Sequence, residues 1–394
     1  MKRLIGVCVA LTLLLGAGVA YARGGGVGSL PAFRLRSSYP SYEQVSSWDF
    51  MLGEYRALAK DDMRPQLIFG SSELKSAPAG PAHPGRLFDD GRYGCTSVVV
   101  GRAGVNDLWQ AIEVGAFAPN MPRSDRRAVI FVSMQWFMCY RDPDTTFPGV
   151  FSQGAYDAFM ANPRISRGLK GKVAQRVDSY GVKHAEAHGV SAEGLVGSVD
   201  RAASSLASDL RLAAGLRSGT PDMGAAAIAG RVGVARERRS ASPDWEALIA
   251  EGRSRASKAS AGNEYGFYDS WYREKFKDWL AGAQRSWQVR NGMFFSRQEF
   301  DDLQLTLDVC QEAGVEPLVV IQPVKGKAYD QTIYTREVRE AYYATVRAMC
   351  DRAGVEVADF SGYEYDPLFL RDYSHPSAYG SALYSQALFE FWTK

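Results

Sequence analysis

The chain has almost no net charge. Its 46 basic and 44 acidic side chains nearly cancel and leave +2 over 394 residues. Binding of nucleic acid depends on a strong positive field opposite the phosphates, so this composition argues against that class of protein. The small positive excess still suits work beside anionic lipid or an anionic cell-wall polymer. With 46% apolar residues the chain can build a globular core, which excludes a disordered or fibrous protein.

Cysteine is also scarce. Five cysteines in a chain of this length do not form a disulfide framework, and Cys8 lies inside an apolar run. Cys310 and Cys350 each come four residues before a glycine, in similar helix-end contexts. We expect both to be buried free thiols. A disulfide between them is the alternative, which an exported compartment would permit.

Only four histidines occur, so few residues can act as a general base near neutral pH. They are His83, His184, His188 and His375. His184 and His188 share one face of a helical segment, but no third zinc ligand is near them in the sequence. We therefore expect a solvated helix there and no metal site. For His83 we expect a loop position, with a place lining the active-site pocket as the alternative.

The amino terminus carries a membrane signal. Lys2 and Arg3 precede an uncharged run at 4–22 that is rich in leucine, valine and alanine. About 20 apolar residues cross a bilayer as a helix, and the basic residues before the run stay cytoplasmic. We expect residues 1–23 to form a single-pass anchor, with the remaining chain outside the cell membrane. Residues 20–22 also fit a small-x-small processing site, so a removed signal peptide remains open.

Five short apolar stretches predict the strands of a sheet. Their valine and isoleucine content is nearly continuous rather than alternating, as in parallel strands buried on both faces. They lie at 66–69, 96–100, 128–133, 317–321 and 355–359, and helices are predicted at 297–312, 336–352 and 378–391. The sequence therefore predicts an α/β fold with a mostly parallel central sheet.

The middle of the chain differs in composition. Residues 162–263 are rich in alanine, glycine, serine and arginine and have few large apolar side chains, so we expect a helical insertion or lid. The main domain then consists of residues 24–161 and 264–394. Seven aromatic residues follow the insertion between 265 and 279. We expect them to pack in the core, with a face for a glycan, a lipid headgroup or a membrane partner as the alternative.

His375 has the most favourable context of the four histidines. It comes three residues after Asp372, in a loop between the last predicted strand and the final helix. A carboxylate so close can fix the imidazole tautomer and leave the other nitrogen free to take a proton from a hydroxyl. A histidine on a surface loop is the alternative.

A serine whose hydroxyl such a base could deprotonate follows the first predicted strand. The strand stops at Gly70, and Ser71, Ser72 and Glu73 come next. A serine hydroxyl is a poor nucleophile unless a neighbouring base removes its proton, and backbone N–H groups at a strand-to-helix turn can hold a developing oxyanion. The segment therefore suits an active-site serine. A helix start capped by serine is the alternative.

Several motifs occur in a fixed order along the chain. They are Phe-Gly-Ser-Ser-Glu-Leu at 69–74, Gly-Arg-Ala-Gly at 101–104 followed by Leu108, Ser-Met-Gln-Trp-Phe at 133–137, Gln-Pro-Val-Lys-Gly-Lys at 322–327 and Asp-x-x-His at 372–375. With these motifs and the N-terminal apolar segment, the sequence resembles the DltD family of the SGNH, or GDSL-like, hydrolase superfamily. The resemblance spans essentially the whole body and implies a three-layer SGNH-hydrolase-like fold.

The resemblance implies a role for each matching residue. Ser72 takes the position of the nucleophile, and Asp372 and His375 complete a Ser-His-Asp triad. Gly104 and Gln135 take positions that contact the oxyanion. We also expect substrate contacts from Ser71, Glu73, Arg102 and Trp136, and no cofactor.

Two residues depart from the family pattern. Met134 stands where proline is usual, and Lys325 stands where asparagine is more common. The first departure concerns the block that carries Gln135. The second puts any substrate contact assigned to position 325 in doubt and does not concern the triad.

The resemblance implies D-alanyl transfer outside the cytoplasm. Ser72 would accept a D-alanyl group as an ester and pass it to a hydroxyl of lipoteichoic or wall teichoic acid. The implied partners are DltB, a membrane-bound O-acyltransferase, and a D-alanyl donor derived from the carrier protein DltC. Two alternatives remain open: an esterase or O-acyltransferase that acts on another cell-surface glycan, and a noncatalytic membrane adaptor.

Overall fold

The computed structural model describes residues 40, 42–75, 79–139, 146–182 and 239–394. The predicted N-terminal anchor at 1–23 lies outside these residues, as do His184 and His188. Within the described ranges, no helix combines the length and the apolar character needed to span a membrane.

A parallel sheet forms the centre of the molecule. Its strands are β1 (Pro65–Gly70), β2 (Thr96–Gly101), β3 (Arg127–Val132), β4 (Glu316–Ile321) and β5 (Glu356–Asp359). Neighbouring strands are parallel throughout, in the order β2-β1-β3-β4-β5. Each predicted strand agrees with these bounds to within one residue. The predicted α/β class and parallel sheet are therefore confirmed.

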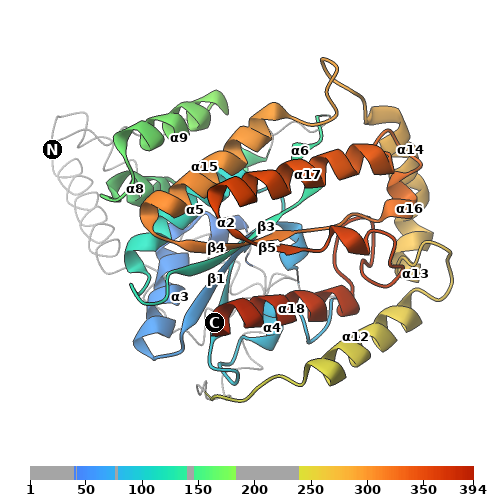
Figure 1. The fold of residues 1–394 in the computed structure, drawn as a ribbon, viewed down its shortest axis with the longest axis horizontal. Coiled ribbons are helices and arrows are strands. Elements are labelled where there is room, and N and C mark those ends of the chain that lie inside the picture. Colours follow the sequence, from blue (N-terminus) through green and yellow to red (C-terminus); the bar gives the residue numbers. More distant parts are fainter. Residues whose placement is uncertain (1–39, 41, 76–78, 140–145, 183–238) are drawn as a thin grey trace, which may run out of the picture.

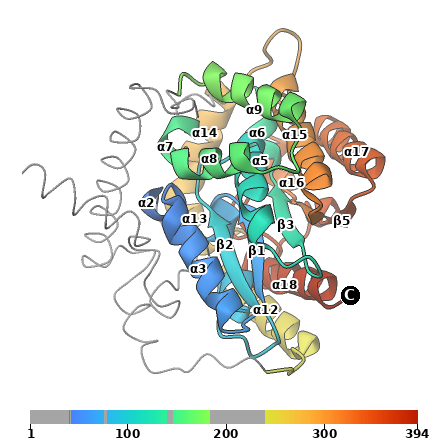
Figure 2. The same ribbon diagram turned by 90° about the vertical axis from the view of Figure 1, so that its left-hand side faces the viewer.

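Helices cover both faces of the sheet (Figures 1 and 2). One face carries α3 (Trp48–Lys60), α5 (Asp107–Phe117), α15 (Arg297–Ala313) and α17 (Arg336–Ala353), and the other carries α4 (Pro84–Leu87), α12 (Trp245–Ala259) and α18 (Ala378–Thr393). Alternate residues of β1 enter the two cores: Leu67 and Phe69 pack with the first group, Ile68 with the second. Burial on both faces explains why the strand sequences are continuously apolar.

The shorter elements connect these layers. They are α2 (Tyr42–Val45), a 3-10 turn (Ser72–Leu74), a second one (Ala118–Asn120), α6 (Met134–Phe137), α7 (Phe147–Val150), α8 (Gln153–Ala161), α9 (Arg167–Ser179), α13 (Asp269–Trp271), a π-helical turn (Tyr272–Phe276), α14 (Lys277–Ser286), α16 (Gly326–Tyr329) and a third 3-10 turn (Ser361–Tyr363).

The predicted helices of the last third are also confirmed. Helices α15 and α17 both end at a glycine in the left-handed region, Gly314 (φ 68°) and Gly354 (φ 65°), where glycine has no steric cost. At the start of α18 the Ser377 hydroxyl accepts the N–H groups of Tyr379 and Gly380. This cap fixes the exit of the loop that carries His375.

The described flanks of segment 162–263 are helical and pack on the body. Helix α9 contacts α5 and α15, where the Arg176 guanidinium donates to both oxygens of Asp302 at 2.9 Å. Helix α12 lies along α18 so closely that a Cβ atom at Gly252 would come within 2.6 Å of the Ala378 carbonyl oxygen. The predicted role of the segment as an insertion or lid stays a prediction, because residues 183–238 lie outside the described part.

The described cysteines are all free thiols. Cys310 and Cys350 are buried, on α15 and α17 respectively. Burial raises the pKa of each thiol to about 12. The expectation of buried free thiols is confirmed, and the alternative disulfide is not formed.

Candidate active site

The carboxyl ends of the first strands lie side by side at one edge of the sheet. Gly70, the last residue of β1, is the register partner of Gly101, the last residue of β2. A Cβ atom at Gly101 would overlap the Gly70 carbonyl, so only glycine lets the two strand ends approach this closely. Ser72 comes two residues after Gly70 and begins a 3-10 turn. Ligands of open parallel sheets bind at the carboxyl ends of the strands, at the point where the strand order reverses. In this sheet that point lies between β1 and β3.

The structure brings the three predicted triad residues into contact. The Nε2 atom of His375 lies 2.8 Å from the Ser72 Oγ atom, although 303 residues separate them in sequence. The Nδ1 atom of His375 lies 2.9 Å from each carboxylate oxygen of Asp372. Asp372 also accepts the backbone N–H groups of Ser374 and His375, at 3.0 and 2.9 Å. The loop thus holds the carboxylate and the imidazole in a fixed relation.

The charge of Asp372 decides which imidazole nitrogen carries the proton. Burial would raise the pKa of this carboxyl, but His375, Arg371 and the Ser374 N–H together lower it to about 2. The ionised carboxylate can only accept hydrogen bonds, so Nδ1 of His375 donates to it. In the neutral imidazole, Nε2 is then the acceptor that faces the Ser72 hydroxyl. This is the arrangement that a serine nucleophile requires.

Ser71 and Glu73 hold the turn on either side of Ser72. Both are almost fully buried, with exposed fractions of 2% and 4%. The Glu73 carboxylate accepts the Ser71 N–H, and the Ser71 hydroxyl donates to the Arg102 carbonyl at 3.3 Å. Burial raises the pKa of Glu73 above its usual value. Substrate contacts are predicted for both residues. In the structure, their hydrogen bonds hold the turn that carries Ser72.

A cavity of about 410 Å³ opens in front of Ser72 and His375. Gly104, Gln135 and Trp136 line it, so the residues expected to contact the oxyanion lie around the same space as the serine. Gly104 adopts φ 94°, a conformation that favours glycine. The Gln135 amide donates one hydrogen bond to the Tyr329 hydroxyl at 3.0 Å. The predicted substrate residue Arg102 lines a neighbouring cavity that also reaches Ser72.

A family model described as DltD protein matches residues 46–393 of the chain. The chain belongs to the DltD family. It is 27% identical to Protein DltD of Bacillus subtilis (strain 168) over 332 residues, which cover 82% of this chain and 81% of that protein. The resemblance predicted from the ordered motifs is therefore confirmed. All three residues that meet at the edge of the sheet fall within the part matched by the DltD model.

The DltD-family chain builds one wall of its cavity from the aromatic residues that follow the insertion. We call residues 265–287 the aromatic strap. Phe267 and Phe276 are buried in it, as expected for core packing, but Trp279 and Trp287 also line the cavity beside Ser72. Trp279 stacks on Tyr373, a residue of the loop between Asp372 and His375, with ring centroids 5.1 Å apart. Core packing and a binding face were the two alternatives for residues 265–279, and the stacking of Trp279 on Tyr373 has no signal in the local sequence.

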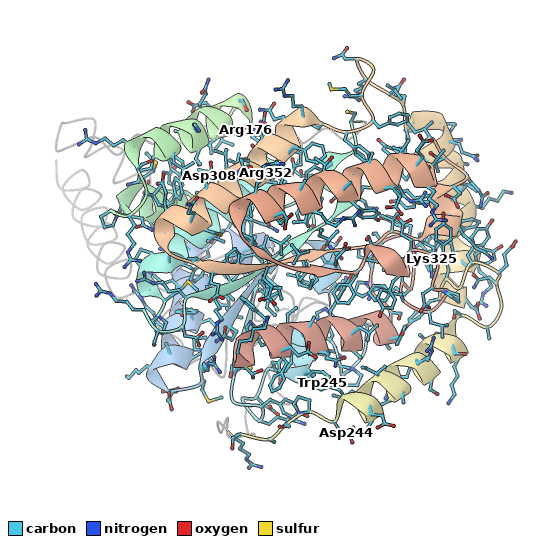
Figure 3. The ribbon with its side chains drawn as sticks, in the orientation of Figure 1. Arg176, Asp244, Trp245, Asp308, Lys325 and Arg352 are labelled. Atoms are coloured by element: carbon cyan, nitrogen blue, oxygen red, sulfur yellow. The ribbon has the colours of Figure 1, made fainter. Side chains whose placement is uncertain are left out.

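Lys325, the second departure from the family pattern, is buried at the start of α16 (Figure 3). Its ammonium donates to the carbonyls of Pro367 and Gly266, at 2.9 and 3.3 Å, and its backbone N–H donates to the Tyr373 carbonyl at 3.0 Å. Burial lowers the pKa of Lys325 to about 7, although Asp366 and Asp372 act in the opposite direction. The side chain therefore joins the aromatic strap to the loop of Asp372.

His83 caps a helix and does not line the described cavities. Its Nδ1 atom accepts the Gly85 N–H at 3.1 Å at the start of α4, and Nε2 lies 3.3 Å from the Glu73 carbonyl. Burial lowers the pKa of His83 to about 3, so the ring stays neutral. The loop position expected for His83 is confirmed, and the residue is a buried helix cap beneath the turn that carries Ser72. In the described ranges, no three histidine, cysteine or acidic side chains are grouped so as to hold a metal ion.

Proposed function

We propose that the chain is a serine-dependent D-alanyl transferase that acts outside the cytoplasm on teichoic acids. Membership of the DltD family, with the D-alanylation role that the family resemblance implies, supports the substrate. The contact of Ser72 with His375, and of His375 with Asp372, is the observation that carries the proposed chemistry. It provides a nucleophile, a base and an orienting carboxylate in one hydrogen-bonded row.

The reaction proceeds in two exchanges of an acyl group. In the first, the Ser72 oxygen attacks the carbonyl carbon of the D-alanyl donor while His375 takes the hydroxyl proton. Collapse of the tetrahedral intermediate breaks the donor bond, and His375 returns the proton to the leaving group. In the second, His375 takes the proton of a polymer hydroxyl, which attacks the Ser72 ester. Ser72 leaves and regains a proton from His375.

The negative charge that develops on the carbonyl oxygen needs hydrogen-bond donors. We assign this role to the backbone N–H of Gly104 and to the second amide hydrogen of Gln135, both beside Ser72 in the cavity. The Tyr329 hydroxyl, which accepts the other amide hydrogen of Gln135, keeps that amide in place. Donors fixed before the reaction stabilise the transition state without reorganisation.

The proposed location is the outer face of the cell membrane, with residues 1–23 as a single-pass anchor. The basic residues before the apolar run support this orientation. Here the chain would receive a D-alanyl group that originates on DltC and passes through DltB. Digestion of intact cells by an external protease shows on which side of the membrane the body of the chain lies. Protection of the full-length chain from the protease would contradict the proposed location.

A single substitution tests the chemistry in cells. The Ser72→Ala variant, expressed in a strain that lacks the chain, should restore no D-alanine esters to the envelope, because it has no nucleophile. The matched control Ser254→Ala, at an exposed position of α12, should restore them fully. Restoration by Ser72→Ala would indicate an adaptor. Rapid release of D-alanine to water by the purified wild-type chain alone would indicate an esterase.

A further inference from the structure

Two cavities of different character meet at Ser72. The first, described above, we call the indole cavity because Trp136, Trp279 and Trp287 line it. The second has a volume of about 470 Å³ and is named here the basic cavity. Its charged lining residues are Lys75, Arg102, Lys275, Arg371, Glu274 and Asp372. Because both cavities include Ser72, Ala103 and His375, groups bound in either one can reach the same hydroxyl.

The two cavities carry opposite charge. In the basic cavity four cationic side chains face two carboxylates, and one of these, Asp372, is engaged by His375 and by Arg371 at 3.6 Å. Among the described residues that line the indole cavity, the carboxyl groups are those of Glu73 and Asp278, and neither lysine nor arginine is present. A charged substrate group is therefore attracted to one side of Ser72 and repelled from the other.

The aromatic strap supplies charged side chains to both cavities, with Glu274 beside Lys275 in the basic cavity. Lys275 lines the basic cavity and Asp278, three residues later, lines the indole cavity. The π-helical turn Tyr272–Phe276 lies just before α14. A π turn has more residues per turn than an α-helix and so changes the direction of the side chains around it, and such turns are frequent at functional sites. Tyr373 packs against both Trp271 and Trp279, with ring centroids 5.6 and 5.1 Å apart.

This inference rests on the proposed function. We propose that the indole cavity binds the ammonium group of the D-alanyl moiety and that the basic cavity binds a phosphate of the acceptor polymer. Asp278 lines the same cavity as Trp279 and Trp287. A carboxylate and indole rings around one cavity suit an alkylammonium ion. Clustered lysine and arginine side chains suit a phosphodiester. The two substrates then approach the Ser72 oxygen from opposite sides, and each is repelled from the cavity of the other.

The test measures binding in a chain that cannot form the ester. Full-length Ser72→Ala protein is titrated with D-alanine methyl ester and, separately, with glycerol 1-phosphate. Adding Asp278→Asn should weaken binding of the amino ester by about tenfold and leave glycerol 1-phosphate unchanged. Adding Lys275→Gln should weaken glycerol 1-phosphate by about tenfold and leave the amino ester unchanged.

Two substitutions on α12 serve as controls. Glu246→Gln and Lys258→Gln remove one exposed charge of each sign and should change neither affinity. The assignment is overturned if Asp278→Asn and Lys275→Gln weaken both probes alike, or neither. Since the Ser72→Ala background cannot carry an acyl group, this failure would leave the proposed acyl transfer standing. Conversely, restoration of D-alanine esters by Ser72→Ala would rule out the proposed acyl transfer and would not change the measured affinities for the two probes.

Discussion

At the scale of single residues, the site depends on a carboxylate that fixes a tautomer. Asp372 accepts from Nδ1 of His375, and its lowered pKa keeps it ionised at neutral pH. In Asp372→Asn the amide N–H can donate to Nδ1 of His375, which favours the tautomer that carries its proton on Nε2. That tautomer cannot accept the proton of the Ser72 hydroxyl. We expect acyl transfer to fall by about 10⁴-fold while the fold is retained.

Initial rates of D-alanyl transfer and thermal unfolding of the purified variant measure the two effects. Asp351→Asn, an exposed substitution at the end of α17, is the control and should keep the wild-type rate. A rate within about threefold of wild type for Asp372→Asn would contradict the role of the carboxylate.

Lys325 makes the stability of the chain depend on pH. Its pKa lies at about 7 in the folded chain against 10.5 for the free side chain, so the unfolded chain binds more protons between these values. The cost of burying the charge is therefore fully present below about pH 7 and is relieved as the pH rises. Relative to Lys325→Met, the wild type should gain up to about 1.4 kcal/mol of unfolding free energy per pH unit in this window.

Urea unfolding at pH values from 7 to 10 measures this difference. Lys327→Met is the matched control, because its exposed ammonium lies nearby and donates to the Glu264 carbonyl at 3.1 Å. That variant should follow the pH dependence of the wild type. A constant difference between the wild type and Lys325→Met across the window would contradict the buried, titrating lysine.

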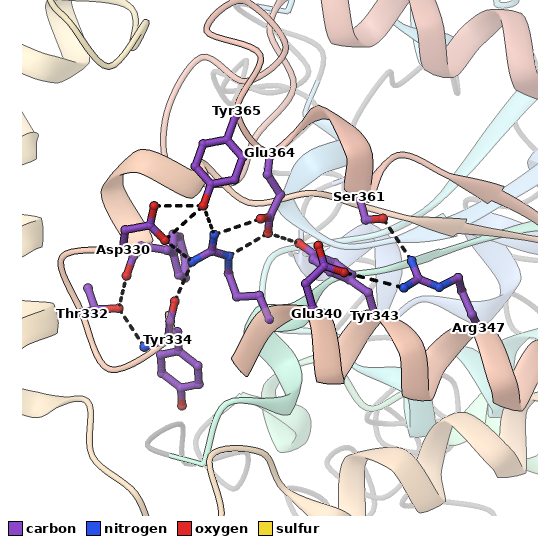
Figure 4. A network of polar contacts seen from close by, with 11 residues as sticks. Asp330, Thr332, Tyr334, Glu340, Tyr343, Arg347, Ser361, Glu364 and Tyr365 are labelled. Carbon is purple, nitrogen blue, oxygen red and sulfur yellow. Dashed lines mark hydrogen bonds and ion pairs between the residues drawn. The ribbon is translucent and has the colours of Figure 1, made fainter. Parts of the chain in front are cut away.

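At the scale of elements, a network of polar contacts joins α17 to the loops that lead to the site, and Figure 4 labels Tyr343, Glu364 and Asp330 among its members. The fully buried Arg339 guanidinium donates to both oxygens of Glu364, at 2.8 and 2.9 Å, and to Asp330 at 2.9 Å. The Tyr343 hydroxyl donates to the same Glu364 carboxylate at 2.8 Å. The Glu364 carbonyl in turn accepts the Gly326 N–H at 2.9 Å. The network therefore sets the start of α16 against the loop after β5.

Removal of the arginine should be costly. Arg339→Met leaves the buried Glu364 carboxylate without its cation, which we expect to lower the free energy of unfolding by about 3–5 kcal/mol. Arg347→Met breaks an ion pair with Asp359 nearer the surface, and we expect a loss below about 1 kcal/mol. Denaturant unfolding of both variants compares them. Equal losses would contradict the importance of the buried network.

At the scale of the whole molecule, the sequence predicts what depends on local pattern. Strand bounds follow from continuous apolar runs between turns, and the Asp372–His375 pair follows from a spacing of three residues. The approach of Ser72 to His375 depends on the parallel sheet, which places the end of β1 near the loop after β5. Ordered family motifs indicated that contact, whereas composition and periodicity alone left it open.

Other features could not be predicted, because each depends on two distant segments. The aromatic strap forms a wall only where Trp279 meets Tyr373, and Lys325 is buried only because Gly266 and Pro367 converge on it. The place of His83 beneath the serine turn likewise involves the Glu73 carbonyl, ten residues earlier. Local sequence carries no signal of these partners. Charge alone would place Lys325 at the surface.

In the proposed mechanism, Ser72 carries the D-alanyl group as an ester. Full-length wild-type chain, incubated with the complete D-alanylation system and quenched in acid, is digested and its peptides are weighed by mass spectrometry. We expect one alanyl adduct, on the peptide that contains Ser72, and none in Ser72→Ala or in wild type without the donor. Transfer of D-alanine to teichoic acid by Ser72→Ala at the wild-type rate would contradict it.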